Sequence, residues 1–342
     1  MVIQYKCPNC GSDMKFDSKT GTLSCPSCKR QDQIEDFSDE FIERKFSGDE
    51  IVHYECNNCG AEILTDPDTT ATSCSFCGAP VVLGDRLSGH LAPAKVIPFS
   101  ISKEEATRAF KKWCRNGVLT PRGFMAANRI KGITGIYVPF WMYDLNSQAK
   151  VKATGTKVST YTRGDYIYTE TRYYDVYRDI DLRYVKVPVD ASEKLNDELM
   201  DMLEPYDYGN LKEFKMPYLA GYIAEKYNFT DEELLSRVKQ KVQPFIDSYV
   251  QSTINGYATV NYKQKEIQTA QKNAQYVLLP VWMFYYDFDG EEHIFAMNGQ
   301  TGKVVGKPPL SKGKMTAWFS GLAGSSFLAM KLISFAMSGV IW

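Results

Sequence analysis

The sequence predicts an α+β protein with a cysteine-rich N-terminal region, a duplicated α+β region of antiparallel sheet, and a C-terminal transmembrane helix. Three observations divide the 342 residues in this way. Eight of the nine cysteines lie in the first quarter of the chain. A Pro-x-Trp-Met-aromatic segment occurs twice in the remainder, and the last 28 residues contain a single charged side chain.

The first eight cysteines form two quartets with the same spacing. Each quartet contains two Cys-x-x-Cys pairs separated by 14 residues, and the second quartet repeats the first at an offset of 49. Such a turn directs two thiolates at one tetrahedral cation, and a second turn across a short antiparallel ribbon completes the four-sulfur shell. The sequence therefore predicts two tandem zinc ribbons, over 1–30 and 52–83, each with one structural Zn²⁺. The predicted ligands are Cys7, Cys10, Cys25, Cys28, Cys56, Cys59, Cys74 and Cys77.

Disulfide bonding is the alternative use of these cysteines. Disulfides are typical of small secreted domains, and no secretory signal is recognised in this sequence. The spacing also matches the zinc pattern, so we expect reduced thiolates and a reducing compartment.

The ribbon region is acidic. Residues 1–90 carry 8 Lys or Arg against 15 Asp or Glu, a net charge of −7, whereas the remainder carries 32 against 26. Residues 31–51, between the ribbons, predict an acidic connector with a short amphipathic helix. Nucleic-acid-binding modules usually carry a basic surface, because much of their affinity comes from phosphate neutralisation. The charge therefore favours a protein partner for the ribbons.

The larger region contains a second internal duplication. The segment 139–143 (PFWMY) recurs as 280–284 (PVWMF), at an offset of 141. A capping box precedes an amphipathic helix upstream of each copy, with Ser102 and Glu105 in the first and Thr230 and Glu233 in the second. We therefore predict two related α+β units over 94–190 and 212–310, joined by a linking helix within 191–211.

The strands of these units follow from alternation of side chains. Residues 150–187 are rich in Thr, Tyr and Val with a period of two, and a turn is expected at 163–165. This pattern predicts a long hairpin with a further strand. Further strands are expected at about 257–269, 276–289 and 291–297. The Trp-Met-aromatic segments are predicted to be core strands.

Residues 315–342 predict the transmembrane helix. A span needs about 20 apolar residues, and a preceding basic collar places the bulk of the chain in the cytoplasm by the positive-inside rule. The collar comprises Lys303, Lys307, Lys312 and Lys314. These features predict a single-pass protein of the cell membrane, with small residues from Ser320 to Ser325 that could seat a second helix in an oligomer. A buried or interfacial amphipathic helix is the alternative.

No catalytic motif is recognised. The three histidines stand outside any HExxH pattern, and the sequence contains neither a GxxxxGK[ST] phosphate loop nor a GxSxG elbow. We therefore predict no catalytic residues, no cofactor other than zinc, and no enzymatic activity.

Family resemblance adds to this interpretation. The pairs within 7–11 (CPNCG) and 25–28 (CPSC) resemble TFIIB-type zinc ribbons. The two Pro-x-Trp-Met segments, the turn at 298–304 (NGQTGKV) and the lysine-rich approach to the C-terminus make the whole chain resemble bacterial zinc-ribbon membrane proteins. Members of that group are often labelled primosomal (PriA-like) helicases, but a helicase motor needs the phosphate loop that this sequence lacks. The resemblance implies a partner with an SPFH domain, similar to flotillin.

Two functions follow as hypotheses. The first is a membrane-anchored scaffold that recruits a protein partner to the cytoplasmic face. The second is a zinc-ribbon nucleic-acid-binding factor in replication or transcription. The salt dependence of binding distinguishes the two hypotheses, because binding to nucleic acid weakens steeply as the salt concentration rises.

Overall fold

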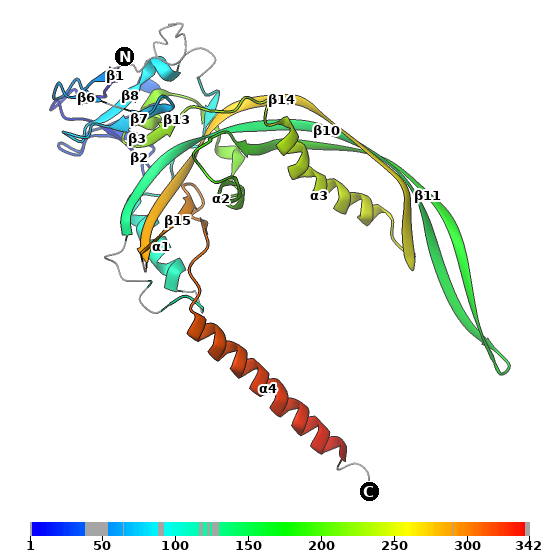
Figure 1. The fold of residues 1–342 in the computed structure, drawn as a ribbon. Helices are drawn as coiled ribbons and strands as arrows, with labels where there is room; N and C mark the ends of the chain where they lie inside the picture. Colours follow the sequence, from blue (N-terminus) through cyan, green and yellow to red (C-terminus); the bar gives the residue numbers. More distant parts are fainter. Residues whose placement is uncertain are drawn as a thin grey trace.

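The computed structural model describes residues 2–37, 54–63, 65–87, 92–115, 119–121, 124, 130–288 and 290–338 (Figure 1). In these residues most strands belong to one mixed sheet of eleven strands, with the main order β1-β8-β7-β13-β10-β14-β15-β16. Its strands are β1 (Val2–Ile3), β7 (Thr69–Ser73), β8 (Pro80–Leu83), β9 (Lys95–Val96), β10 (Ile130–Arg163), β11 (Tyr166–Asp190), β12 (Lys212–Glu213), β13 (Ile223–Glu225), β14 (Thr259–Phe288), β15 (Glu291–Asn298) and β16 (Val304–Val305). Two small ribbon sheets comprise β2 (Lys15–Asp17), β3 (Thr22–Ser24), β4 (Gln31–Asp32), β5 (Tyr54–Glu55) and β6 (Glu62–Ile63).

Within the described ranges, four α-helices accompany the sheet: α1 (Lys103–Arg115), α2 (Asp197–Met202), α3 (Leu235–Thr253) and α4 (Lys312–Ser338). The hydrogen bonds of both predicted capping boxes are present, the first at the start of α1 and the second in the turn at 230–234 just before α3. The Glu105 carboxylate accepts a hydrogen bond from the Ser102 backbone N–H at 3.0 Å, and Glu233 accepts from the Thr230 N–H at 2.7 Å. Each box satisfies backbone donors that a helix N-terminus otherwise leaves without partners.

The duplicated segments form adjacent strands. β10 and β14 run antiparallel, and Val138 pairs with Leu279. These two residues are separated by 141 positions, which is the offset of the sequence repeat. The two copies therefore meet at equivalent residues, around a local pseudo-two-fold axis in the middle of the sheet.

The tryptophan of each copy donates a hydrogen bond to the backbone of the other predicted unit. Trp141 Nε1, on β10, donates to the carbonyl oxygen of Phe229 at 2.8 Å, immediately before the second capping box. Trp282 Nε1, on β14, donates to the carbonyl oxygen of Ile101 at 3.0 Å, immediately before the first. The two predicted units therefore contribute interleaved strands to one sheet, with both tryptophans near the core as expected.

The predicted hairpin forms a long curved arm, but the prediction of a further strand by residue 187 is wrong, because β11 runs unbroken to Asp190. β10 and β11 pair without interruption from Leu145–Tyr184 to Arg163–Tyr166, and Gly164 takes a φ of +64° in the turn. α3 lies against the concave side of the arm, where Val238, Val242 and Ile246 are buried against strand side chains (Figure 1). The outer end of the arm extends beyond this helix as a two-stranded ribbon.

Hydrogen bonds attach the ribbons to the large sheet, so they are not separate domains on a flexible linker. β1, at the start of the first ribbon, pairs with β8, so that Val2 lies opposite Leu83. The first ribbon also packs on the core, because the Phe16 backbone N–H donates to the Ala220 carbonyl oxygen at 2.9 Å. Of the predicted connector, residues 31–37 form β4 and a 3₁₀ turn, and 38–51 lie outside the described residues.

The predicted transmembrane helix over 315–342 is wrong. α4 covers most of this range, but no helix in the described part of the chain combines the length and apolar character that crossing a membrane requires. At 27 residues α4 is long enough, so composition is the reason: glycines and serines between 320 and 326 interrupt the apolar run, and Lys331 adds a charge. The α+β class with a large sheet stands, while the membrane-spanning part of the predicted fold and the single-pass membrane localisation do not.

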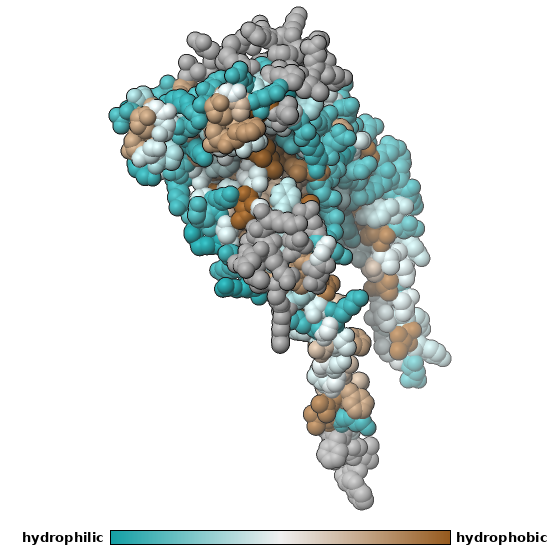
Figure 2. All heavy atoms as spheres, turned by 60° about the vertical axis from the view of Figure 1, so that its left-hand side comes forward, coloured by the Kyte–Doolittle hydropathy of each residue, from teal (hydrophilic) through white to brown (hydrophobic). Residues whose placement is uncertain are grey.

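α4 nevertheless exposes apolar side chains. Trp318 and Phe319 are 52% and 75% exposed, and Ile167 on the arm is 74% exposed. Figure 2 shows hydrophobic side chains emerging on α4 and along the arm.

Candidate metal centres

The first ribbon builds its four-sulfur site from two similar turns. After Cys7 the chain reverses, so that the Gly11 N–H donates to the Cys7 carbonyl oxygen at 2.8 Å. After Cys25 the Lys29 N–H makes the equivalent bond to Cys25 at 3.0 Å. The short strands β2 and β3 carry one turn to the other. Each turn directs its two sulfurs at a common centre, as the spacing predicts.

The sulfur positions fit a zinc ion. All four Sγ atoms of each predicted quartet lie within 4.8 Å of one another. In the first site Cys7 and Cys28 are 3.5 Å apart, as are Cys10 and Cys25. In the second site Cys56 and Cys77 are 3.7 Å apart, and Cys59 and Cys74 are 3.8 Å apart. A tetrahedron with Zn–S bonds of about 2.3 Å has edges of about 3.8 Å, so both quartets suit one Zn²⁺ each.

Polar side chains around the second site escaped the sequence analysis. Gln4 Nε2 lies 3.6 Å from Cys56 Sγ, and Asn58 Nδ2 lies 3.5 Å from Cys77 Sγ. Lys6 Nζ donates to Asn58 Oδ1 at 2.9 Å and orients that amide. Groups of this kind stabilise thiolates and fix the ligand geometry. Gln4 and Lys6 lie in the first ribbon, ahead of Cys7, so only the folded structure reveals that they contact the second.

Hydrogen bonds favour the thiolate form at two ligands. The Ser12 backbone N–H lowers the pKa of Cys10 to about 6, and the Asn58 amide lowers the pKa of Cys77 to about 6. Zinc binds thiolates, so these donors favour metal binding at Cys10 and Cys77. Burial has the opposite effect at Cys7, whose pKa is raised to about 11.

One residue in the first ribbon adopts an unfavourable backbone conformation. Lys29 has a φ of +63°, whereas Gly11, Gly60 and Gly78 occupy the corresponding positions of the other three turns with φ between +71° and +74°. A side chain in this left-handed region costs about 1 kcal/mol. We expect Lys29→Gly to stabilise the first ribbon by up to about 1 kcal/mol, less the greater entropy of glycine in the unfolded chain.

The measurement is zinc release to a chromogenic chelator during denaturation. Lys29→Ala is the control, because it removes the hydrogen bond from Lys29 Nζ to the Pro26 carbonyl oxygen but keeps a Cβ. Equal behaviour of the two variants would show that backbone strain is not the cause.

Comparisons with known proteins agree with the metal centres. A family model described as TFIIB zinc-binding matches residues 5–46, which include the first ribbon. The uncharacterized protein YdjG of Bacillus subtilis (strain 168) is 66% identical over 339 residues, covering 99% of each chain. The chain belongs to the YdjG family.

This member of the YdjG family therefore contains a TFIIB-type zinc ribbon and a second four-cysteine cluster of similar geometry. No solved structure matches the chain significantly. The expected resemblance to zinc-ribbon proteins is confirmed, and its membrane-spanning part is not supported.

Proposed function

We propose that this protein is a non-catalytic adaptor whose zinc ribbons hold a binding surface for a protein partner. The donor set supports a structural role for the metal. Four cysteine sulfurs close the tetrahedral shell of each centre and leave no position open for a substrate or a water nucleophile. The metal would stabilise the fold that presents the surface.

Phe76 carries this proposal. Its side chain is 78% exposed, and it lies between Cys74 and Cys77 in a turn that two metal ligands fix. A large apolar side chain on a rigid support loses little conformational freedom on binding, and aromatic residues of this kind dominate many protein interfaces. The corresponding position in the first ribbon is Ser27, so the exposed ring is not a requirement of the zinc turn.

Charge indicates the kind of partner. Glu55 and Glu62 are exposed on the second ribbon, within an N-terminal region of net charge −7. A partner with an apolar pocket and a basic rim would complement this surface. An SPFH-domain protein is the candidate that the family resemblance implies, and it serves as the first partner to test.

A photo-reactive phenylalanine analogue at position 76 would identify the partner by cross-linking in cells, with the same analogue at position 27 as the control. Binding of the identified protein to the purified zinc-loaded chain is then measured. Phe76→Ser should weaken that binding by about 30-fold, the effect of truncating an aromatic anchor, and Ser27→Ala should leave it unchanged.

Binding to a DNA duplex tests the other hypothesis. The adaptor function predicts no binding that depends steeply on salt. Tight duplex binding by the ribbons that weakens as salt rises, together with no partner cross-linked at position 76, would overturn the proposal in favour of a nucleic-acid factor.

A further inference from the structure

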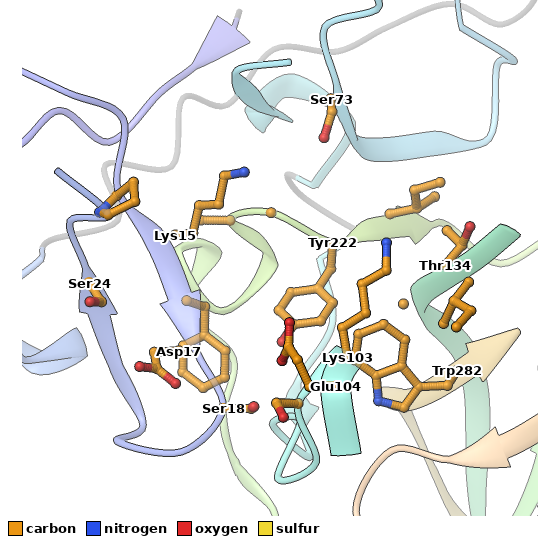
Figure 3. A pocket seen from close by; sticks show the side chains of 18 of the residues that line it. Lys15, Asp17, Ser18, Ser24, Ser73, Lys103, Glu104, Thr134, Tyr222 and Trp282 are labelled. Atoms are coloured by element: carbon orange, nitrogen blue, oxygen red, sulfur yellow. The ribbon is translucent and has the colours of Figure 1, made fainter. Parts of the chain in front are cut away.

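A cavity of about 730 Å³ lies where the first ribbon, the large sheet and α1 meet (Figure 3). Its walls come from distant parts of the chain. β2 contributes Lys15 and Asp17, β7 contributes Ser73, β10 contributes Thr134, and the start of α1 contributes Lys103. No cysteine ligand lines the cavity, although Ser24 and Ser73 each directly precede one in the chain.

The cavity coincides with a break in the sheet. β13 is only three residues long and pairs with β10 on one side and β7 on the other. Before Ile223 the chain turns away at Gly221, where φ is +93°. β10 continues past this point as residues 130–135, and β7 continues as Thr72 and Ser73. Since β7 and β10 stand two strand spacings apart, about 9.6 Å, the gap between them is one strand wide.

Backbone groups of β10 face this gap. Residues 130–135 pair with β14 on one side, and no described strand pairs with their other side. Alternate residues of such a strand direct their N–H and C=O groups away from the existing partner. Gly132 and Gly135 also interrupt this stretch, and glycine within a strand often marks the close approach of another backbone. A Cβ at Gly132 would meet nothing within 4 Å.

Aromatic rings form the floor of the cavity. Tyr222 stacks on Phe99 with a ring separation of 4.2 Å and an interplanar angle of 9°. The Trp282 ring lies 6.0 Å from Tyr222, and a Cβ at Gly135 would come within 3.0 Å of both rings. An apolar side chain entering the gap would therefore meet a preformed aromatic surface.

The mouth of the cavity carries two lysines. Lys15 and Lys103 make no ion pair with any described residue, and in Figure 3 their ammonium groups lie toward Ser73. The carboxylates of Asp17 and Glu104 lie farther from Ser73, on the side of the Tyr222 ring (Figure 3). The part of the cavity next to the gap is thus basic, which favours an acidic side chain there.

We propose that this cavity binds an extended peptide segment of a partner protein as an added strand between β7 and β10. The peptide backbone pairs with the free edge at 132–135. One apolar side chain lies over Tyr222 and Trp282, and a neighbouring acidic side chain lies near Lys15 and Lys103. Strand addition at a sheet edge is an established mode of peptide recognition. The inference deepens the proposed adaptor function, since it names a recognition element of the partner.

The test uses the full zinc-loaded chain and a displayed library of random decapeptides. Selected peptides are synthesised with a fluorophore, and their affinity is measured by anisotropy. We expect peptides with an acidic residue close to an apolar one. Ser73→Trp, which fills the gap from an exposed position, should weaken binding by about tenfold or more, and Lys103→Gln should weaken it less. Thr171→Trp, on the exposed arm, is the matched control and should change nothing.

Backbone pairing has its own measurement. Amide hydrogen exchange at 132–135 should slow when the peptide binds, and N-methylation of the central peptide residues should abolish binding. Failure to select any peptide that Ser73→Trp weakens would overturn the inference, as would equal binding of the N-methylated peptide. A dimer of the free chain that Ser73→Trp dissociates would also overturn it, by making a second copy the occupant.

The two proposals fail separately. A partner whose binding depends on Phe76 but not on Ser73 would keep the adaptor function and refute the peptide site. If peptides bind the cavity but no partner is cross-linked at position 76, the peptide site is kept and the Phe76 surface is refuted.

Discussion

Cys74→Ser should remove one of the two zinc ions and open the large sheet from its ribbon side. Cys74 directly follows β7, and Cys77 comes just before β8, so the metal fixes the turn that joins these two strands. β7 in turn pairs with β13, and β8 pairs with β1. Structural zinc contributes an apparent binding free energy of about 10–16 kcal/mol, which rivals the stability of a whole domain, about 5–15 kcal/mol. The second ribbon therefore cannot stay folded without its metal.

Native mass spectrometry should count one zinc ion in this variant in place of two. Hydrogen exchange should show faster exchange at 69–73, 80–83 and 223–225, with α3 still protected. Cys114→Ser is the control, because Cys114 is buried on α1 and belongs to neither cluster. Two bound zinc ions and unchanged exchange in Cys74→Ser would show that Cys74 is not a ligand.

Arg237→Ala should destabilise the fold by about 3–5 kcal/mol, the usual effect of leaving a buried charge without its partner. Asp190 is fully buried at the end of β11, and its Oδ1 accepts from Arg237 Nη2, on α3, at 2.6 Å. Asp190 Oδ2 has no hydrogen-bond partner. Arginine is therefore the main compensation that this carboxylate has.

The same pair predicts a pH dependence. Burial raises the pKa of Asp190 from 3.8 to about 6, against the opposing effect of Arg237. A carboxyl group whose pKa is raised on folding contributes stability in its protonated form, and this contribution is lost as the pH rises through the folded-state pKa. Arg237 lowers the pKa of Asp190, so its removal should raise that pKa further and increase the pH dependence of stability. In urea denaturation the deficit of Arg237→Ala should be smaller near pH 5 than near pH 8, by roughly 1 kcal/mol or more.

The duplication supplies the matched control. Asn298 ends β15 in the second copy, at the position where Asp190 ends β11 in the first. The next residue makes the same hydrogen bond in both copies. Ala191 N–H donates to the carbonyl oxygen of Pro139, and Gly299 N–H donates to that of Pro280. Asp190→Asn should therefore recover much of the stability in the Arg237→Ala background and remove the pH dependence. A double variant as unstable as Arg237→Ala would show that the lost stability comes from arginine packing and not from the unpaired buried carboxylate of Asp190.

The sequence predicted the features that local chemistry determines. The Cys-x-x-Cys spacing identified all eight sulfur ligands, because a zinc turn is specified within a few residues. The capping boxes at Ser102 and Thr230 and the turn at Gly164 were likewise encoded locally. The repeated Pro-x-Trp-Met segments correctly indicated core strands.

Features that depend on distant contacts were missed. Nothing near Gln4 indicates that it reaches Cys56, and nothing near Trp141 indicates that it holds the entrance to α3. Alternation located β14 but divided it into two strands, because its register with β10 is set by the partner strand. The prediction of a transmembrane helix at the C-terminus was wrong for another reason. Its low charge suggested a membrane span, although glycine and serine make a helix much less apolar than the absence of charge implies.

The exchanged tryptophan contacts bear on the origin of the chain. A single ancestral half could satisfy them only by associating with an identical molecule, so the arrangement corresponds to a fused homodimer. In such a fusion the two halves need not stay identical, and here they differ in the long arm, with 25 residues in β11 against 8 in β15. Polypeptides separated in the loop between α2 and β12 should accordingly recover the native sheet when mixed, and neither should do so alone.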